Sequence, residues 1–186
     1  MVYDYKYCKC NKCTKIKQTL IKVDNFKYKM KKTNNQEIRG TILNLVAKNR
    51  QVIYGQQSVN YFLPQGLKRK TKDIDILTKK PKQSAEELVR ELNKKFNGDR
   101  FKVKEALHRG TFKVKDTKTK ETIADYTGTT KKPKSYKLFG VRFAKEGYQL
   151  EKIRKSLKNP EASYRHKKDL DTLERIKKAR QSLNWR

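Results

Sequence analysis

Two aspartates, Asp73 and Asp75, stand one residue apart in the segment KTKDIDIL, and an isoleucine follows each of them. Side chains two residues apart in a β-strand point to the same face, so the alternation predicts both carboxylates on one face. Hard carboxylate oxygens are the ligands that Mg²⁺ prefers. Two such cations about 3.5–4 Å apart stabilise the attacking and the leaving oxygens of phosphoryl transfer. The pair therefore predicts a site for metal-dependent phosphoryl chemistry.

A third acid, Asp125, lies in the apolar segment ETIADYT. The alternation of a strand puts it on the face of Ile123, opposite Ala124 and Tyr126. If this strand lies beside KDIDIL, Asp125 reaches the first two acids, where it would hold one metal and orient the attacking hydroxyl. The alternative is a set of strand-edge acids paired with the abundant lysines. Three acids inside apolar strands favour the metal interpretation.

A phosphate-binding turn is predicted in the stretch VIYGQQS, where a strand passes into a helix at Gly55. Glycine permits close backbone approach, and the first N–H groups of a helix can bind phosphate oxygens. Gln56 and Ser58 could add donors, and Lys72, just before the acids, could neutralise phosphate charge. The alternatives are an ordinary helix-start glycine, a packing role for Ser58 and a solvated lysine.

The surrounding pattern predicts an α+β fold, a mixed sheet flanked by helices and followed by C-terminal helices. A capping box of Ser84 and Glu87 predicts the start of one helix. The last helix is expected to bury the stripe Leu170, Leu173, Ile176 and Leu183. Helices are expected over residues 34–50, 57–63, 84–98, 148–157 and beyond Pro160, and strands over 51–55, 72–77, 101–107, 111–116, 121–127 and 140–143.

The charge of the chain predicts a polyanionic partner. Lysine and arginine number 49 against 19 acidic residues, a net charge of +30, and the basic residues occur from end to end. Such a field attracts nucleic acid, with RNA favoured, although lysine as a default surface residue is an alternative explanation. No apolar run approaches the roughly 20 residues that span a membrane, so we expect a soluble, cytoplasmic protein without a membrane partner.

A cluster of three cysteines, Cys8, Cys10 and Cys13, lies in YCKCNKCTK. Thiolates at this spacing could hold Zn²⁺, but a closed structural site needs a fourth ligand. The alternative is a basic N-terminal segment with incidental reduced thiols.

The order of these features is more specific than any one of them: strand, glycine, helix, D-x-D strand, helix, then a hairpin with an acid in its second strand. It resembles the nucleotidyltransferases of the DNA-polymerase-beta superfamily. Within that superfamily, VIYGQQSVNYFLP…KTKDIDIL is similar to the catalytic segment of viral-type poly(A) polymerases, and YRHKKDLDTL resembles their C-terminal helix. The resemblance covers roughly residues 35–180.

This resemblance implies that Asp73, Asp75 and Asp125 are catalytic ligands of Mg²⁺ or Mn²⁺. It also implies that Gly55, with Gln56 and Ser58, contacts the triphosphate of the incoming nucleotide, with ATP favoured. The expected reaction is template-independent transfer of a nucleoside monophosphate to a nucleic-acid 3′ end, and the protein is expected to be virus-encoded. The expected organisation is a basic extension over 1–34, a catalytic core over 35–145 and C-terminal helices over 146–186.

Two features depart from the family. Gly-Gly or Gly-Ser is usual where this chain has Gly55-Gln56, and the chain lacks room for the additional domains of full poly(A) polymerases. Two other functions stay open: a toxin-like nucleotidyltransferase that modifies tRNA or protein, and a non-catalytic basic module that binds nucleic acid.

Overall fold

The structure, a computed structural model, describes residues 34–183. The chain divides into two units, Met1–Glu37 and Ile38–Arg186, and the account below concerns the second. The cysteine cluster Cys8, Cys10 and Cys13, proposed for zinc, lies outside the described residues. The predicted domain boundaries after residues 34 and 145 stay predictions. None of the helices in the described part combines the length and the hydropathy needed to cross a membrane.

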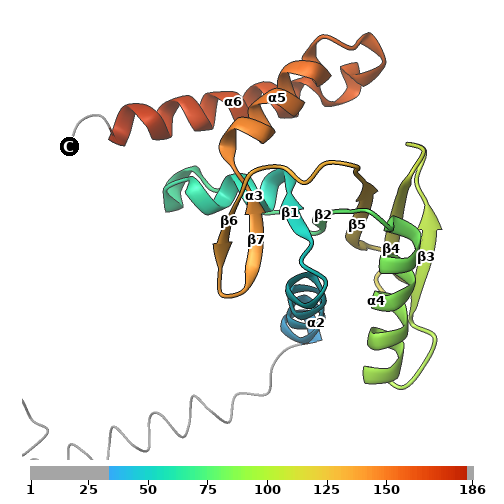
Figure 1. The fold of residues 1–186 in the computed structure, drawn as a ribbon. Coiled ribbons are helices and arrows are strands. Elements are labelled where there is room, and N and C mark those ends of the chain that lie inside the picture. Colours follow the sequence, from blue (N-terminus) through green and yellow to red (C-terminus); the bar gives the residue numbers. More distant parts are fainter. Residues whose placement is uncertain (1–33, 184–186) are drawn as a thin grey trace, which may run out of the picture. The chain divides into compact units, whose positions relative to one another are not determined.

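A seven-stranded mixed sheet forms the centre of the second unit, in the order β3-β4-β5-β2-β1-β7-β6 (Figure 1). The pairs β2–β5 and β1–β7 are parallel, and the other neighbours are antiparallel. The strands are β1 (Val52–Tyr54), β2 (Ile74–Thr78), β3 (Phe101–Glu105), β4 (Thr111–Asp116), β5 (Thr122–Gly128), β6 (Ser135–Leu138) and β7 (Val141–Ala144).

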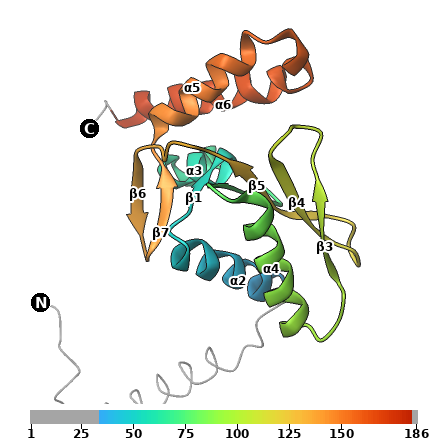
Figure 2. The same cartoon turned by 45° about the vertical axis from the view of Figure 1, so that its right-hand side comes forward.

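Helices cover both faces of this sheet, as the two views show, with α2 on one side and α5 and α6 on the other (Figures 1 and 2). Short 3₁₀ turns at Gln65–Leu67 and Pro160–Ala162 lead out of α3 and into α6. The helices are α2 (Asn34–Lys48), α3 (Gly55–Phe62), α4 (Pro81–Lys95), α5 (Glu146–Leu157) and α6 (Ser163–Leu183).

The main hydrophobic core lies between the sheet and helices α2 and α4. On β2, Ile74 and Ile76 point into this core, and on β5 so do Ala124 and Tyr126, all with 1% exposure or less. Because strand side chains alternate, the intervening Asp75 and Asp125 must point to the opposite face. The apolar half of each strand thus determines where the acidic half lies.

A second, smaller core ties α3 to the C-terminal helices. It contains Val59 of α3 and Leu63, which directly follows α3, with Ile176 and Ala179 of α6. Helix α3 has only eight residues, which is too short to be stable alone, so its helical form depends on this packing.

The predicted α+β fold is confirmed, with three local corrections. Strand β6, at one edge of the sheet, was not predicted, because its residues read as part of a basic loop. Helix α4 begins at Pro81, so Ser84 lies inside it rather than at its N-cap. There the Ser84 hydroxyl is buried and accepts a 2.8 Å hydrogen bond from the Gln51 side chain.

The buried stripe of α6 also differs from the prediction. Leu170 is 56% exposed, whereas the residues with less than 6% exposure are Asp169, Thr172, Ile176 and Ala179. The prediction chose leucines by hydrophobicity, but the helix is rotated so that Asp169 faces inward. There its carboxylate accepts hydrogen bonds of 3.1 and 3.3 Å from Arg165, one turn earlier in the helix.

Candidate active site

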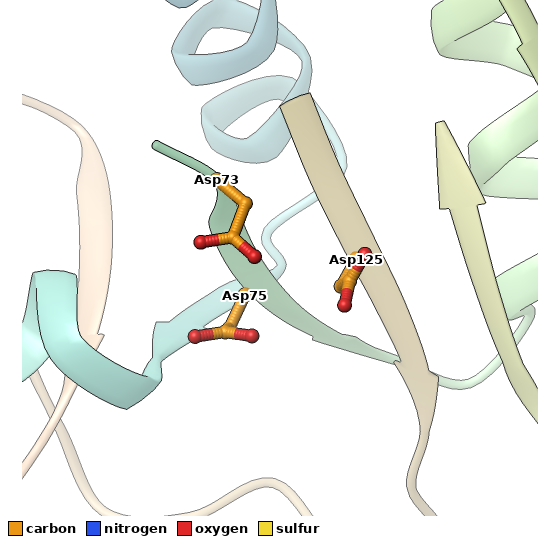
Figure 3. Close-up of side chains that lie close together, drawn as sticks. All are labelled: Asp73, Asp75 and Asp125. Carbon is orange, nitrogen blue, oxygen red and sulfur yellow. The ribbon is translucent and has the colours of Figure 1, made fainter. Parts of the chain in front are cut away.

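The three predicted acids meet on the face of the sheet opposite the main core. Strands β2 and β5 are parallel neighbours, and their register pairs Asp75 directly with Asp125. Asp73 lies just before β2 and shares the face of Asp75. Each residue offers one carboxylate oxygen, and these three oxygens lie within 4.8 Å of one another (Figure 3). The predicted pairing of the two acidic strands is therefore present.

The electrostatics of the acids fit a divalent cation. Burial, followed by the charges of Asp73 and Asp125, raises the pKa of Asp75 to about 7. Burial likewise raises the pKa of Asp125, although Lys113 at 3.9 Å opposes the shift. Asp125 Oδ1 is buried without a hydrogen-bond partner among the described residues. Converging carboxylate oxygens that repel one another, one of them without a donor, are what a cation would neutralise.

Gly55 lies against the acids, and its proximity to Asp75 explains why the position needs glycine. Its φ of +67° falls in the left-handed region, and a Cβ there would lie 1.9 Å from Asp75 Oδ2. The Gly55 N–H, which was expected to face phosphate, donates a 3.2 Å hydrogen bond to Gln149 Oε1 of α5. Close approach to a carboxylate is thus one structural reason for glycine at this position, and its contact with a triphosphate stays a prediction.

Of the two other residues of α3 that were predicted to contact the nucleotide, Gln56 lies near the acids and Ser58 lies in the protein interior. Gln56 lies beside the site, where its side chain accepts a hydrogen bond of 2.6 Å from Arg69 and donates one of 2.8 Å to Asn60. Ser58 is fully buried, and its hydroxyl donates to the Ala144 carbonyl at 2.5 Å, so the structure does not bring it to the acids.

Lys72 lies at the rim of the site and forms an exposed 2.6 Å ion pair with Glu121. The pocket beside it has a volume of about 340 Å³ and includes Asp73, Lys70 and Lys168 in its lining. Of the three acids, Asp73 thus lines a small pocket whose walls are mostly basic.

Helices α5 and α6 bring further cations to the acids. Lys152 and Lys168 both lower the pKa of Asp75. Lys168 lies in the segment YRHKKDLDTL, for which the sequence left substrate contact and a solvated helix face open, whereas Lys152 was not singled out. The Lys152 ammonium lies 4.3 Å from the centre of the Tyr54 ring, and burial lowers its own pKa. No signal selects Lys152, because it is one among the 49 lysines and arginines of the chain.

Gln149 of α5, which the sequence also did not indicate, is a buried polar residue in contact with Gly55. It is 4% exposed, and its oxygen is held by the Gly55 N–H. Because the amide oxygen accepts this bond, the orientation of the amide group is fixed. Its nitrogen, Nε2, is buried and has no hydrogen-bond partner among the described residues. A buried donor without a partner costs about 1–3 kcal/mol, which suits a group that meets a ligand.

Comparison with known proteins supports this reading of the fold. No protein-family profile matches the sequence, and no curated protein matches it significantly. Among solved structures, the Megavirus polyadenylate synthase superposes with a TM-score of 0.68 at 16% identity over 96% of this chain. JHP933 from Helicobacter pylori matches 67% of this chain and 55% of its own at 16% identity, but with a TM-score of only 0.39.

The chain covers 39% of the length of the Megavirus protein. Within that length it contains the mixed sheet, the acidic triad and the helices that face the triad. The chain therefore has the fold of a poly(A) polymerase-like nucleotidyltransferase.

Proposed function

We propose that the protein is a metal-dependent nucleotidyltransferase that transfers a nucleoside monophosphate from a nucleoside triphosphate to an acceptor hydroxyl. The observation that supports this function best is the convergence of three carboxylate oxygens within 4.8 Å on neighbouring strands. Asp73 and Asp75 would hold Mg²⁺ or Mn²⁺, and Asp125 would complete the ligand set. Bound there, the cations would supply charge stabilisation for the oxygens of the transferring phosphate.

The chain's own residues would position the reactants. The acceptor hydroxyl attacks the α-phosphorus, the bond to the bridging oxygen breaks, and pyrophosphate leaves. Asp125 is suited to accept the hydroxyl proton, because burial raises its pKa above the usual value. Lys152 and Lys168, which already act on the charge of Asp75, would face the negative charge of the triphosphate.

We infer that the acceptor is a nucleic-acid 3′ end, RNA rather than DNA, and that the donor is ATP. The net charge of +30 supports a polyanionic acceptor, and the similarity to a polyadenylate synthase supports adenylate transfer. Gln56 and Lys72, at the rim of the pocket, would contact the nucleotide, and a viral source would agree with the Megavirus neighbour.

The test is incorporation of each labelled nucleoside triphosphate into single-stranded RNA, tRNA and the protein itself, with Mg²⁺ or Mn²⁺. We expect repeated addition to RNA, with ATP preferred, and loss of incorporation in Asp75→Asn. Asp99→Asn removes an exposed acid in the loop between α4 and β3, outside the triad, and serves as the matched control. Single additions confined to tRNA or protein would favour the toxin-like reaction. Absence of transfer to every acceptor, with Asp75→Asn equal to the parent, would contradict an enzymatic role.

A further inference from the structure

Three aromatic rings, from α3, β6 and β7, gather at the β6 edge of the sheet. Tyr61 of α3 stacks on Phe143 of β7, with ring centres 5.4 Å apart and planes 10° apart. Tyr136 of β6 lies 6.0 Å from Tyr61 and is the cross-strand partner of Phe143. We call Tyr61, Tyr136 and Phe143 the aromatic platform.

The platform combines a buried support with accessible rings. Phe143 packs against the main core, whereas Tyr61 is 40% exposed and Tyr136 is 42% exposed. Rings held by a rigid sheet lose little conformational entropy when another flat group stacks on them. The two tyrosines therefore offer a prepared surface for stacking.

Cations flank the platform on the same edge. The Lys145 ammonium lies 5.0 Å from the centre of the Tyr136 ring. Lys134 is two residues before Tyr136, so the alternation of a strand carries it toward the same face, and its carbonyl accepts a 2.9 Å hydrogen bond from the Lys145 N–H. In the described part of the chain, neither lysine forms an ion pair with a carboxylate. The platform thus has free positive charge beside accessible aromatic faces.

The platform lies on the opposite face of the sheet from the acids. Phe143 pairs with Ile53 of β1, which pairs with Ile76 of β2, so the platform shares the face of the main core. Any ligand bound there is therefore held by the platform itself and not by the acidic triad.

We propose that the aromatic platform binds single-stranded nucleic acid. A base stacks on Tyr136 or Tyr61, and the neighbouring phosphates lie against Lys134 and Lys145. Aromatic rings interleaved with cations suit a single strand because stacking needs an unpaired base, whereas a duplex hides its base faces. This goes beyond the proposed transferase reaction, since such binding requires neither a nucleoside triphosphate nor a metal.

The experiment is fluorescence anisotropy of a labelled oligouridylate with the full chain, without nucleotide and with chelator. Tyr136→Leu removes the ring but keeps apolar bulk, and we expect affinity to fall about 5- to 20-fold at both low and moderate salt. Tyr136→Phe keeps the ring, and we expect affinity within about twofold of the parent. Thermal unfolding of each variant verifies that the fold is retained.

The lysine contribution is separated by its salt dependence. Lys145→Gln is expected to reduce the slope of log affinity against log salt by about 0.7, the value for one phosphate contact on a single strand. Lys102→Gln is the matched control, because it removes an exposed strand lysine from β3 at the opposite edge of the same sheet. We expect its slope to equal that of the parent.

Three results would overturn the proposal. Equal affinities of Tyr136→Leu and Tyr136→Phe would show that the ring is not used. Equal slopes of Lys145→Gln and Lys102→Gln would show that binding is spread over the whole basic surface. A duplex that competes as well as the single strand would show that no unpaired base is needed. Failure of the transferase assay would leave all three measurements unaffected.

Discussion

Two buried acids on the same sheet, Asp116 of β4 and Asp75 of β2, have opposite electrostatic environments. Asp116 is 2% exposed and accepts hydrogen bonds of 2.9 and 2.5 Å from Arg100, which lower its pKa. Arg100 in turn lies against the rings of Phe96 and Phe101, at 5.1 and 5.0 Å. Asp75 has no ion pair or side-chain hydrogen bond in the described part of the chain, and its pKa is raised to about 7.

The contrast indicates that Asp116 stabilises the fold, whereas Asp75 and its two acidic neighbours are available to a ligand. The chain has cations in large excess, so it could have paired Asp75 as fully as it pairs Asp116. Instead it collects three carboxylates and keeps Lys152 and Lys168 at a distance where they only moderate the repulsion. Asp75 thus has no ion pair among the described residues, and Asp125 has only a long 3.9 Å contact with Lys113. In so basic a protein, acids that are this weakly paired point to a function that needs their charge.

The largest expected effect is on stability at Asp116. Asp116→Asn leaves the buried Arg100 without its charge partner, so we expect a loss of about 3–5 kcal/mol in the free energy of unfolding. Asp75→Asn removes repulsion and is expected to leave stability unchanged or higher. Urea unfolding of both variants measures the difference. Losses of equal size would contradict the distinction drawn between the two acids.

The second expected effect is an opposite pH dependence in metal-free protein. The folded-state pKa of Asp75, about 7, lies above its ordinary value of 3.8, so the folded protein binds the extra proton. Its contribution to stability therefore falls as pH rises from about 4 to about 7, by about 3 kcal/mol. The folded-state pKa of Asp116 is lowered, so its contribution is lost as pH falls below about 4.

Unfolding free energies measured between acid and neutral pH, in chelator, test both slopes. Asp75→Asn should lose the decline toward neutral pH and keep the acid-side loss. Asp116→Asn should lose the acid-side dependence alone. A parent curve that rises steadily from pH 4 to 7, unchanged in Asp75→Asn, would refute the raised pKa.

The third expected effect is stabilisation by a divalent cation. At ten times the dissociation constant, a cation that binds only the folded state adds about 1.4 kcal/mol. Mn²⁺ should therefore raise the melting temperature of the parent but not that of Asp125→Asn. The Asp116→Asn variant, although less stable, should retain the Mn²⁺ response. An equal response in all three would mean that Mn²⁺ binds elsewhere.

The smallest expected effect is at Gly55. Gly55→Ala places a methyl group where Asp75 Oδ2 lies and imposes a φ of +67° on alanine, which costs about 1 kcal/mol. Because the methyl group must displace the carboxylate, we expect weaker Mn²⁺ stabilisation as well. Gly110→Ala, at φ +78° with open space around it, is the control for backbone strain alone. Equal Mn²⁺ responses in the two variants would contradict the contact between Gly55 and Asp75.

Much of the fold and the acidic half of the site could be predicted, because both follow from local alternation. The pattern of KDIDIL and ETIADYT separates apolar and acidic faces, and one pairing of these strands brings the acids together. Strand β6 was not predicted, because the alternation of SYKL covers only four residues next to the basic stretch TTKKPK, and its pairing with β7 is a contact that the sequence does not show.

Lys152 and Gln149 could not be predicted either. Lys152 acts on Asp75, and Gln149 contacts Gly55, because of how α5 packs, which is a long-range property. The orientation of α6 itself was missed, because a buried Asp169 paired with Arg165 took the place expected for a leucine. A buried polar residue of this kind cannot be recognised from the hydrophobic pattern of the sequence.

Two hydrogen bonds attach the first half of helix α3 to other parts of the chain: the Gly55 N–H donates to Gln149, and the Ser58 hydroxyl donates to the carbonyl of Ala144, the last residue of β7. A peptide of eight residues has no helical persistence of its own, so any undocking of α5 would fray this turn first. The amide protons of α3 would then exchange with solvent at the rate at which the C-terminal helices undock. Hydrogen exchange of this one segment would therefore report how often the acids become accessible.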